Sequence, residues 1–117
     1  MAQFEKTQKV LKLLEKEFRG KVKVDIVERV LYEKDATAIP VETKTPVGVI
    51  FPTSKEEVKR IVEVLYNEGI PMIPRGAGSC LTGGAVPIRG DEVVISFEKM
   101  KKFEIDLDNA TVIAQPG

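Results

Sequence analysis

Apolar residues recur every three or four positions along the first twenty residues of this chain. That spacing predicts an amphipathic helix from about Gln3 to Arg19, with Gly20 as its stop. Lysines and glutamates mix on the other face, so we expect the helix to pack on the edge of a domain. The alternative, a helix on a membrane surface, would favour a basic face. The predicted core positions are Phe4, Val10, Leu11, Leu14 and Phe18.

A second, short helix is predicted after Asp25, which has the spacing of a capping box with Glu28. An irregular, proline-containing stretch follows this helix. It includes Asp35, which we interpret as a turn or capping residue. The apolar stripe of the short helix would be Val27, Val30 and Leu31.

The middle of the chain has the pattern of a β-α-β unit. Residues 47–51 form an apolar run typical of a buried strand. Ser54 and Glu57 then form a capping box for a helix. Because residues 72–73 form a second apolar run between two prolines, we expect two parallel strands joined by that helix. The apolar face of the helix would be Val58, Ile61, Val62, Leu65 and Tyr66.

The second strand leads into a stretch of small residues from Arg75 to Gly84, with glycines at 76, 78, 83 and 84. Glycine adopts positive φ without steric cost, so this loop turns sharply and directs backbone N–H groups into one concavity. Ser79 and Thr82 add hydroxyl donors, and Arg75 adds a forked positive charge suited to phosphate oxygens. Since parallel sheets bind ligands at the carboxyl ends of their strands, the pattern predicts a cradle for a phosphorylated ligand.

Two common glycine-rich loops do not fit this stretch. A P-loop requires Gly-Lys-Ser/Thr at the start of a helix, and no lysine lies between Arg75 and Lys99. A dinucleotide-binding G-x-G-x-x-G turn needs a third glycine where this chain has Leu81, and Pro87 interrupts any following helix. The loop therefore joins strand to strand. A structural turn without a ligand stays the alternative.

Three further strands are expected toward the C-terminus. Glu92 to Ser96 is the third parallel strand, followed by one helical turn over 96–100. Residues 103–107 and 111–114 alternate between apolar and polar, and Asp108-Asn109 between them is typical of a hairpin turn. The predicted fold is α+β, a small three-stranded parallel βαβ sheet flanked by helices, with a C-terminal β-hairpin.

Composition narrows the classes of function. With 43% hydrophobic residues and a net charge of zero, the chain is typical of a globular domain and lacks the basic excess of a nucleic-acid-binding protein. No apolar run approaches the roughly 20 residues that a bilayer requires. A single cysteine excludes an internal disulfide and favours a reducing, cytoplasmic location. The absence of histidine excludes histidine catalysis and argues against a zinc site.

Residues 74–87, Pro-Arg-Gly-Ala-Gly-Ser-Cys-Leu-Thr-Gly-Gly-Ala-Val-Pro, resemble the flavin pyrophosphate loop of the FAD-linked oxidases, the vanillyl-alcohol oxidase/p-cresol methylhydroxylase superfamily. The resemblance is greatest to the branch of the glycolate oxidase subunit and D-lactate dehydrogenase, and it runs in order through residues 32–117. It implies a partial PCMH-type FAD-binding fold. Residues 1–45 would be a helical lead-in, 46–101 the pyrophosphate-binding lobe, and 102–117 the start of a second lobe.

The resemblance implies non-covalent FAD as the cofactor. The backbone from Arg75 to Cys80 and the Ser79 hydroxyl would contact the pyrophosphate, while Gly83 and Gly84 would let the chain pass close to the ribityl and ring region. A cysteinyl–flavin bond at Cys80 is the alternative to a small, partly buried thiol. We predict no catalytic residue and no metal ligand. The predicted cofactor-binding residues are Arg75, Gly76, Ala77, Gly78, Ser79, Cys80, Thr82, Gly83 and Gly84.

The same resemblance implies a parent enzyme that oxidises a 2-hydroxy acid, of glycolate or D-lactate type, by hydride transfer to FAD. Iron–sulfur or other subunits, and a peripheral place at the membrane, fit that family. Since relatives are several times longer, we expect a piece of a longer protein that is inactive alone, or a chain completed by another subunit. The edge of its hairpin favours self-association. Two other functions stay open: the same domain with another substrate, as in alkyl-glycerone-phosphate synthases or sugar-acid oxidases, and a non-catalytic binding or assembly module.

Overall fold

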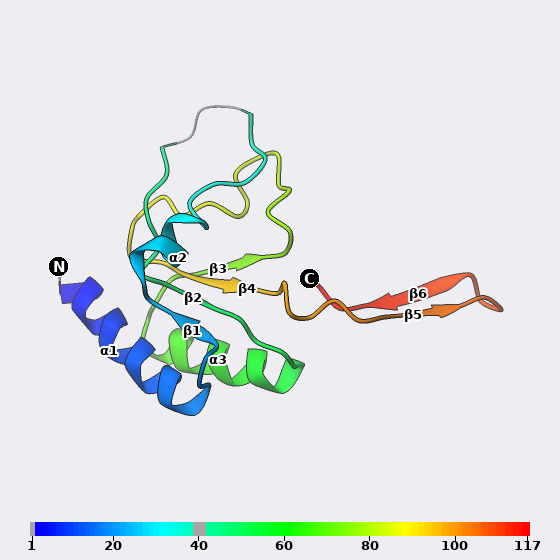
Figure 1. Ribbon diagram of the computed structural model, residues 1–117, viewed down its shortest axis with the longest axis horizontal. Coiled ribbons are helices and arrows are strands. Elements are labelled where there is room, and N and C mark those ends of the chain that lie inside the picture. Colours follow the sequence, from blue (N-terminus) through cyan, green and yellow to red (C-terminus); the bar gives the residue numbers. More distant parts are fainter. Residues whose placement is uncertain (1, 39–41) are drawn as a thin grey trace.

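The computed structural model describes residues 2–38 and 42–117. It has a body built on a four-stranded mixed sheet and a two-stranded hairpin that projects from this body (Figure 1). None of the helices in the described ranges has the length and apolar character needed to cross a membrane. The elements are α1 (Ala2–Glu17), β1 (Val22–Lys23), α2 (Ile26–Val30), β2 (Gly48–Ile50), α3 (Lys55–Asn67), β3 (Met72–Arg75), β4 (Val93–Ser96), β5 (Phe103–Asp106) and β6 (Thr111–Ala114).

The strand order of the larger sheet is β1-β2-β4-β3. Strands β2 and β3 each pair in parallel with β4, which confirms the three predicted parallel strands. β4 takes the inner position between β2 and β3, and all four of its residues are buried. The antiparallel strand β1 pairs Val22 with Ile50 at the edge of β2. The sequence pattern does not predict β1, because two residues carry no periodic signal.

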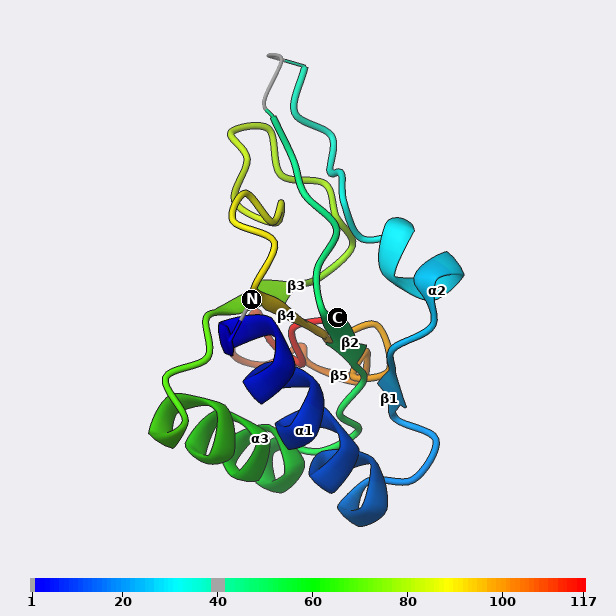
Figure 2. The same ribbon diagram turned by 90° about the vertical axis from the view of Figure 1, so that its left-hand side faces the viewer.

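Helices α1 and α3 lie on the same side of the sheet (Figures 1 and 2). Their apolar faces meet the strands in one cluster that includes Leu11 of α1, Leu65 of α3 and Ile50 of β2, all fully buried. Burying one such side chain contributes roughly 1.5–3 kcal/mol, so this cluster is the main source of stability. Gly48 lets α1 approach β2 closely, because a Cβ there would stand 2.6 Å from Leu11 Cδ1. Four of the five predicted core positions, Val10, Leu11, Leu14 and Phe18, are buried, and Phe4 packs against the cluster partly buried.

The opposite face of the sheet packs against the segment that follows α2. Tyr32 and Phe51 meet there at a ring-centroid distance of 5.8 Å, edge to face, over Val49 and Val94. This smaller cluster joins the N-terminal lead-in to the carboxyl ends of the parallel strands. It therefore connects the core to the loop that follows β3.

Two helix caps are confirmed, but two apolar stripes differ from the prediction. Asp25 accepts a hydrogen bond from the Val27 N–H, and Ser54 accepts one from the Glu57 N–H. The stripe predicted for α2 lies in solvent, because this five-residue helix buries none of its residues. On α3, Ile61 and Leu65 are buried, whereas two predicted core residues are exposed. These exposed apolar residues are Val27, Val30 and Leu31 on α2, and Val62 and Tyr66 on α3.

The segment between β4 and the hairpin contains one hydrogen-bonded turn, where a helical turn was expected over 96–100. The Met100 N–H closes this turn by donating to the Phe97 carbonyl at 2.8 Å. The predicted hairpin is confirmed, with a turn over 107–110 in which the Asn109 N–H donates to the Asp106 carboxylate. Every residue of β5 and β6 is exposed.

Candidate functional site

The loop between β3 and β4 extends from the carboxyl edge of the sheet (Figure 1). Gly78 and Gly83 have φ angles of +72° and +79°, which other residues rarely adopt, so the chain turns sharply at both. Between residues 76 and 82, no backbone N–H donates a hydrogen bond to any residue in the described ranges. Successive N–H groups in such turns form concavities that bind anions. The loop therefore offers several N–H groups without partners among the described residues, and their binding of a phosphate stays a prediction.

The lead-in segment, residues 34–37, contacts the loop through the side chain of Thr37. The Thr37 hydroxyl accepts a hydrogen bond from the Gly83 N–H at 2.7 Å and donates to the Cys80 carbonyl at 3.3 Å. One side chain thus connects two positions three residues apart in the loop. The sequence pattern does not single out Thr37, because this contact joins segments more than forty residues apart.

Asp35 fixes the same segment and the end of the loop. Its carboxylate accepts hydrogen bonds from the Thr37 N–H at 2.9 Å and from the Ala85 N–H at 3.3 Å. Hydrogen bonding from Thr37, followed by the bond from Ala85, lowers the pKa of the Asp35 carboxyl despite partial desolvation. The interpretation of Asp35 as a turn residue is confirmed.

Arg75 lies at the base of the loop, where β3 ends. Its guanidinium donates to the Lys34 carbonyl at 2.7 Å, and its Cζ lies 5.2 Å from the ring centroid of Tyr32. The Tyr32 hydroxyl in turn donates to the Glu98 carboxylate at 3.2 Å. Burial, together with the adjacent Glu98 charge, raises the pKa of Tyr32 to about 12. The Arg75 side chain is thus engaged within the protein, while its charge remains close to the loop.

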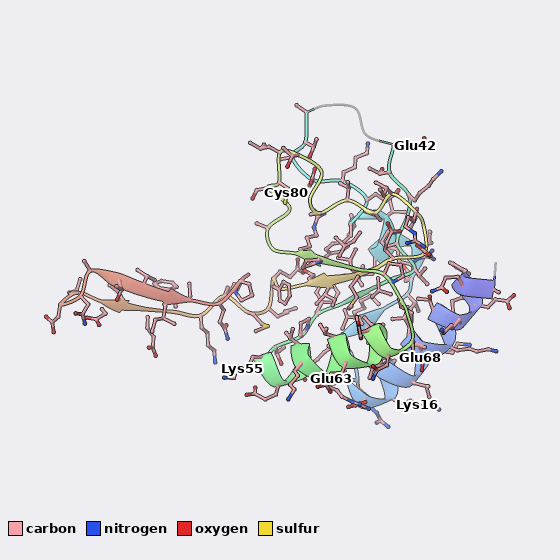
Figure 3. The ribbon with its side chains drawn as sticks, turned by 180° about the vertical axis from the view of Figure 1, so that it is seen from behind. Lys16, Glu42, Lys55, Glu63, Glu68 and Cys80 are labelled. Atoms are coloured by element: carbon pink, nitrogen blue, oxygen red, sulfur yellow. The ribbon has the colours of Figure 1, made fainter. Side chains whose placement is uncertain are left out.

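The predicted site residues fall into two groups. Ala77, Ser79, Cys80 and Thr82 are exposed. Cys80 lies far from the helix that carries Lys55 and Glu63 (Figure 3). The Cys80 thiol is exposed, so the expectation of a partly buried thiol is wrong. The second group has internal contacts through a side chain, a backbone N–H or close packing. It comprises Arg75, held by Lys34; Gly83, held by Thr37; Gly76, which lies beside the Pro116 carbonyl; Gly78, which lies against the Arg75 guanidinium; and Gly84, which lies beside Cys80.

A hollow of about 500 Å³ lies beside Tyr32, at the carboxyl ends of β2 and β4. Its lining comes from several separate segments, so no local motif predicts it. Aromatic rings and charges of both signs surround it, without the row of backbone donors that the loop offers. In the described part of the chain, no cluster of three or more potential ligands is placed to hold a metal ion. The lining includes Arg19, Lys23, Tyr32, Phe51, Glu98 and Lys99.

A family model described as "FAD binding domain" matches residues 46–117, which include both strands flanking the loop and the loop itself. The chain belongs to the FAD binding domain family. FAD is therefore the cofactor associated with this fold, and the matched range includes the loop and the hairpin predicted from the sequence.

Curated relatives of this FAD binding domain include three enzymes. The chain is 36% identical to the glycolate oxidase subunit GlcD of Bacillus subtilis over 76% of its own length and 18% of that protein. It is 41% identical to a D-lactate dehydrogenase of Archaeoglobus fulgidus over 59% of its length and 15% of the relative. It is 33% identical to a D-2-hydroxyglutarate dehydrogenase of Stutzerimonas stutzeri over 84% and 21%, respectively. The chain thus spans about a fifth of the length of these relatives.

Solved structures show the same fold for this FAD binding domain. The 4-ethylphenol oxidase of Gulosibacter chungangensis matches 97% of the chain with a TM-score of 0.83, and 22% of the oxidase is covered. A p-cresol methylhydroxylase matches the whole chain with a TM-score of 0.76, and 23% of that protein is covered. Both are 24% identical to the chain, so these likenesses concern the fold alone. The α+β, PCMH-type fold predicted from the sequence is confirmed.

Proposed function

We propose that the loop over residues 76–82 binds the diphosphate of FAD and that the chain serves a flavin-dependent oxidoreductase acting on a 2-hydroxy acid. The observation that carries the proposal is the run of backbone N–H groups without acceptors among the described residues, at the carboxyl edge of a parallel sheet. Because residues 77 and 79–82 are exposed, their N–H groups are accessible, and the oxygens of a diphosphate can accept several of their hydrogen bonds at once.

The residues of the loop have separate roles in this proposal. The N–H groups of Gly76 through Thr82 provide the main contacts, and the exposed Ser79 and Thr82 hydroxyls add donors. The Arg75 charge, held at the base of the loop by Lys34 and Tyr32, favours an anion nearby without giving up its internal bond. FAD, when bound, supplies the two-electron redox chemistry, and this chain orients it.

The substrate class is proposed from the relatives. Glycolate, D-lactate and D-2-hydroxyglutarate all carry a hydroxyl on the carbon next to a carboxylate, and enzymes named for them are 33–41% identical to the chain. The relation to a glycolate oxidase subunit supports further subunits as partners. We assign residues 46–101 to pyrophosphate binding, with FAD held non-covalently, and assign no catalytic residue to this chain.

The single cysteine allows a direct test, because Cys80 is exposed within the proposed contact loop. The rate of maleimide labelling of Cys80 should fall at least about fivefold at saturating FAD and with inorganic pyrophosphate, since a bound diphosphate covers the loop. Riboflavin, which lacks phosphate, should give little protection. Equal labelling rates with and without saturating FAD would contradict the proposed site.

A matched control separates protection from general effects on thiol reactivity. In the Cys80→Ser, Asn67→Cys double variant, the thiol lies at the exposed end of α3, away from the loop. FAD should leave its labelling rate unchanged. Protection of both thiols would instead indicate non-specific association of FAD with the chain.

A further inference from the structure

The loop over residues 75–85 is attached to the lead-in segment at three levels. At its base the Arg75 guanidinium bonds to the Lys34 carbonyl, in its middle Thr37 contacts Cys80 and Gly83, and at its end Asp35 accepts from Ala85. All of these bonds come from residues 34–37. They use groups on one side of the loop, while the N–H groups of residues 76–82 stay without partners in the described ranges.

Thr37 is the middle attachment and differs from the other two. Its hydroxyl acts as donor and acceptor at once, toward the Cys80 carbonyl and the Gly83 N–H. These two groups flank Leu81 and Thr82, so the hydroxyl closes the C-terminal part of the loop, which carries the Leu81 and Thr82 N–H groups. The hydrogen bonds of Arg75 and Asp35, by contrast, join the lead-in segment to the two ends of the loop.

We propose that Thr37 is a positioning residue for the cofactor diphosphate, holding the loop in its binding conformation before the ligand arrives. Glycine-rich backbone loses more conformational entropy on ordering than other backbone. A loop that is already ordered does not lose this entropy when the ligand binds, so affinity rises without any new contact. This inference rests on the proposed function of the loop and adds a residue outside it.

The positioning role requires a hydroxyl group at position 37 rather than a particular side-chain shape. Thr37→Val keeps the volume and β-branching but removes both hydrogen bonds, and it leaves the part-buried Gly83 N–H without its acceptor. Thr37→Ser restores the hydroxyl and loses only a methyl group. Affinity for FAD should therefore fall about tenfold in Thr37→Val and return to within about threefold of the unaltered chain in Thr37→Ser.

Thr53→Val is a matched control elsewhere in the fold. The Thr53 hydroxyl also accepts one hydrogen bond, from Lys21 at 3.1 Å, and donates one, to Glu57 at 2.7 Å. Its removal should lower the thermal stability of the chain but leave the dissociation constant for FAD unchanged. This control distinguishes a positioned loop from a general loss of stability.

The test combines a titration of the ¹⁵N-labelled chain with FAD and amide hydrogen exchange without FAD. In the unaltered chain the Gly83 N–H should exchange at least about tenfold more slowly than the Ser79 N–H, and Thr37→Val should remove that difference. Equal exchange of these two amides in the unaltered chain would overturn the positioning role, whether or not the valine variant folds.

The outcomes also separate this inference from the proposed function. If FAD and inorganic pyrophosphate leave the amide chemical shifts of the unaltered chain unchanged, the proposed diphosphate site is wrong. The cofactor role of Thr37 is then wrong as well. If the unaltered chain binds FAD and Thr37→Val binds it equally well, the diphosphate site stands and the inference about Thr37 fails. Loss of affinity in both Thr37→Val and Thr37→Ser also counts against it.

Discussion

The guanidinium of Arg75 packs directly on the backbone of Gly78. A Cβ at Gly78 would overlap that guanidinium and stand 2.8 Å from Arg75 Cζ, and Gly78 also has a φ of +72°. The glycine therefore makes room for a side chain of the same loop as well as for a turn. The sequence explains Gly78 by the sharp turn of the loop, and the structure adds the packing of the Arg75 side chain as a second reason.

This relationship predicts the effect of Gly78→Ala. The methyl group would be strained by the positive φ and would displace the flexible end of the Arg75 side chain, so FAD affinity should fall more than about tenfold. Gly69→Ala is the control, because Gly69 has a φ of +68° and an added methyl group would meet no atom within 4 Å. It should reduce stability by about 1 kcal/mol without changing FAD affinity. Titration with FAD and thermal unfolding of both variants check this; equal losses of affinity would contradict it.

Glu92 organises the turn that leads into β4. This buried carboxylate accepts hydrogen bonds from the N–H groups of Ile88, Arg89 and Gly90 at 2.8, 3.0 and 2.7 Å. Burial acts to raise the pKa of Glu92, but the backbone donors outweigh it and lower that pKa. Glu92→Gln replaces one of these acceptor oxygens by an amide NH₂ group. This donor then faces a backbone N–H donor, and the hydrogen bond is lost. It should reduce the free energy of unfolding at neutral pH by about 2 kcal/mol.

The pH dependence of this stability has a definite sign. The folded-state pKa of Glu92 lies below that of the unfolded chain, roughly 4.3 for glutamate, so its stabilisation is fully present above that value. It is lost as the pH falls through the folded pKa. Urea unfolding between pH 3 and pH 7 should give a flatter profile for Glu92→Gln than for the control Glu104→Gln, at an exposed hairpin position. Parallel profiles for the two variants would refute this assignment.

The raised pKa of Tyr32 predicts how the stability of the fold changes at alkaline pH. Its pKa is raised to about 12, first by burial and then by the Glu98 carboxylate. Because the folded-state pKa lies above the unfolded value, roughly 10, stability from the neutral phenol is present below that value and lost as the pH rises toward 12. In Tyr66→Phe, the tyrosinate absorbance of the folded chain reports Tyr32 alone. Adding Glu98→Gln should lower the midpoint; an unchanged midpoint would rule out the Glu98 contribution.

The elements that the sequence predicts well are those whose signals are local. The Ser54 cap, the α1 core positions around Leu11 and Leu14, and the parallel strands all follow from spacing within one segment. The contacts that complete the site are not local. Thr37 contacts the loop from a segment whose Tyr32 packs over Val49 and Val94, on the far side of the sheet from α1. This arrangement depends on the strand order.

The same distinction explains the apolar stripe of α2. Val27 and Leu31 have helical spacing, yet each is 67% exposed, because nothing in the described ranges covers this apolar stripe. Periodicity establishes that a helix has an apolar face. It does not establish that another element covers that face, which depends on tertiary packing.

The two confirmed helix caps should therefore differ in their effect on stability. Helix α3 buries Ile61 and Leu65 in the main core, so Ser54→Ala should reduce the free energy of unfolding by about 1 kcal/mol. Asp25→Ala removes a similar cap from α2, which buries no residue. Local fraying of α2 leaves the core intact, so the loss should be smaller by at least about half. Chemical unfolding of the two variants measures both; a larger loss for Asp25→Ala would contradict the comparison.

The last prediction concerns the hairpin of β5 and β6, whose two faces differ in polarity. Directly paired residues share a face, which places Phe103 with Ala114 and Ile105 with Val112 on one side. Phe103 and Ile105 are 65% and 60% exposed, so this side is an apolar surface on a projecting ribbon with two open edges. Such surfaces associate with one another in water.

We therefore expect the chain to self-associate through this face as its concentration rises. Ile105→Lys should shift sedimentation toward the monomer at every concentration, since it adds a charge to the apolar side. Thr111→Lys adds the same charge to the opposite face, where Asp106 is its paired neighbour, and should have a smaller effect. Equal effects of the two substitutions would assign the association to net charge rather than to the apolar face. A monomer across the whole concentration range in the unaltered chain would exclude self-association.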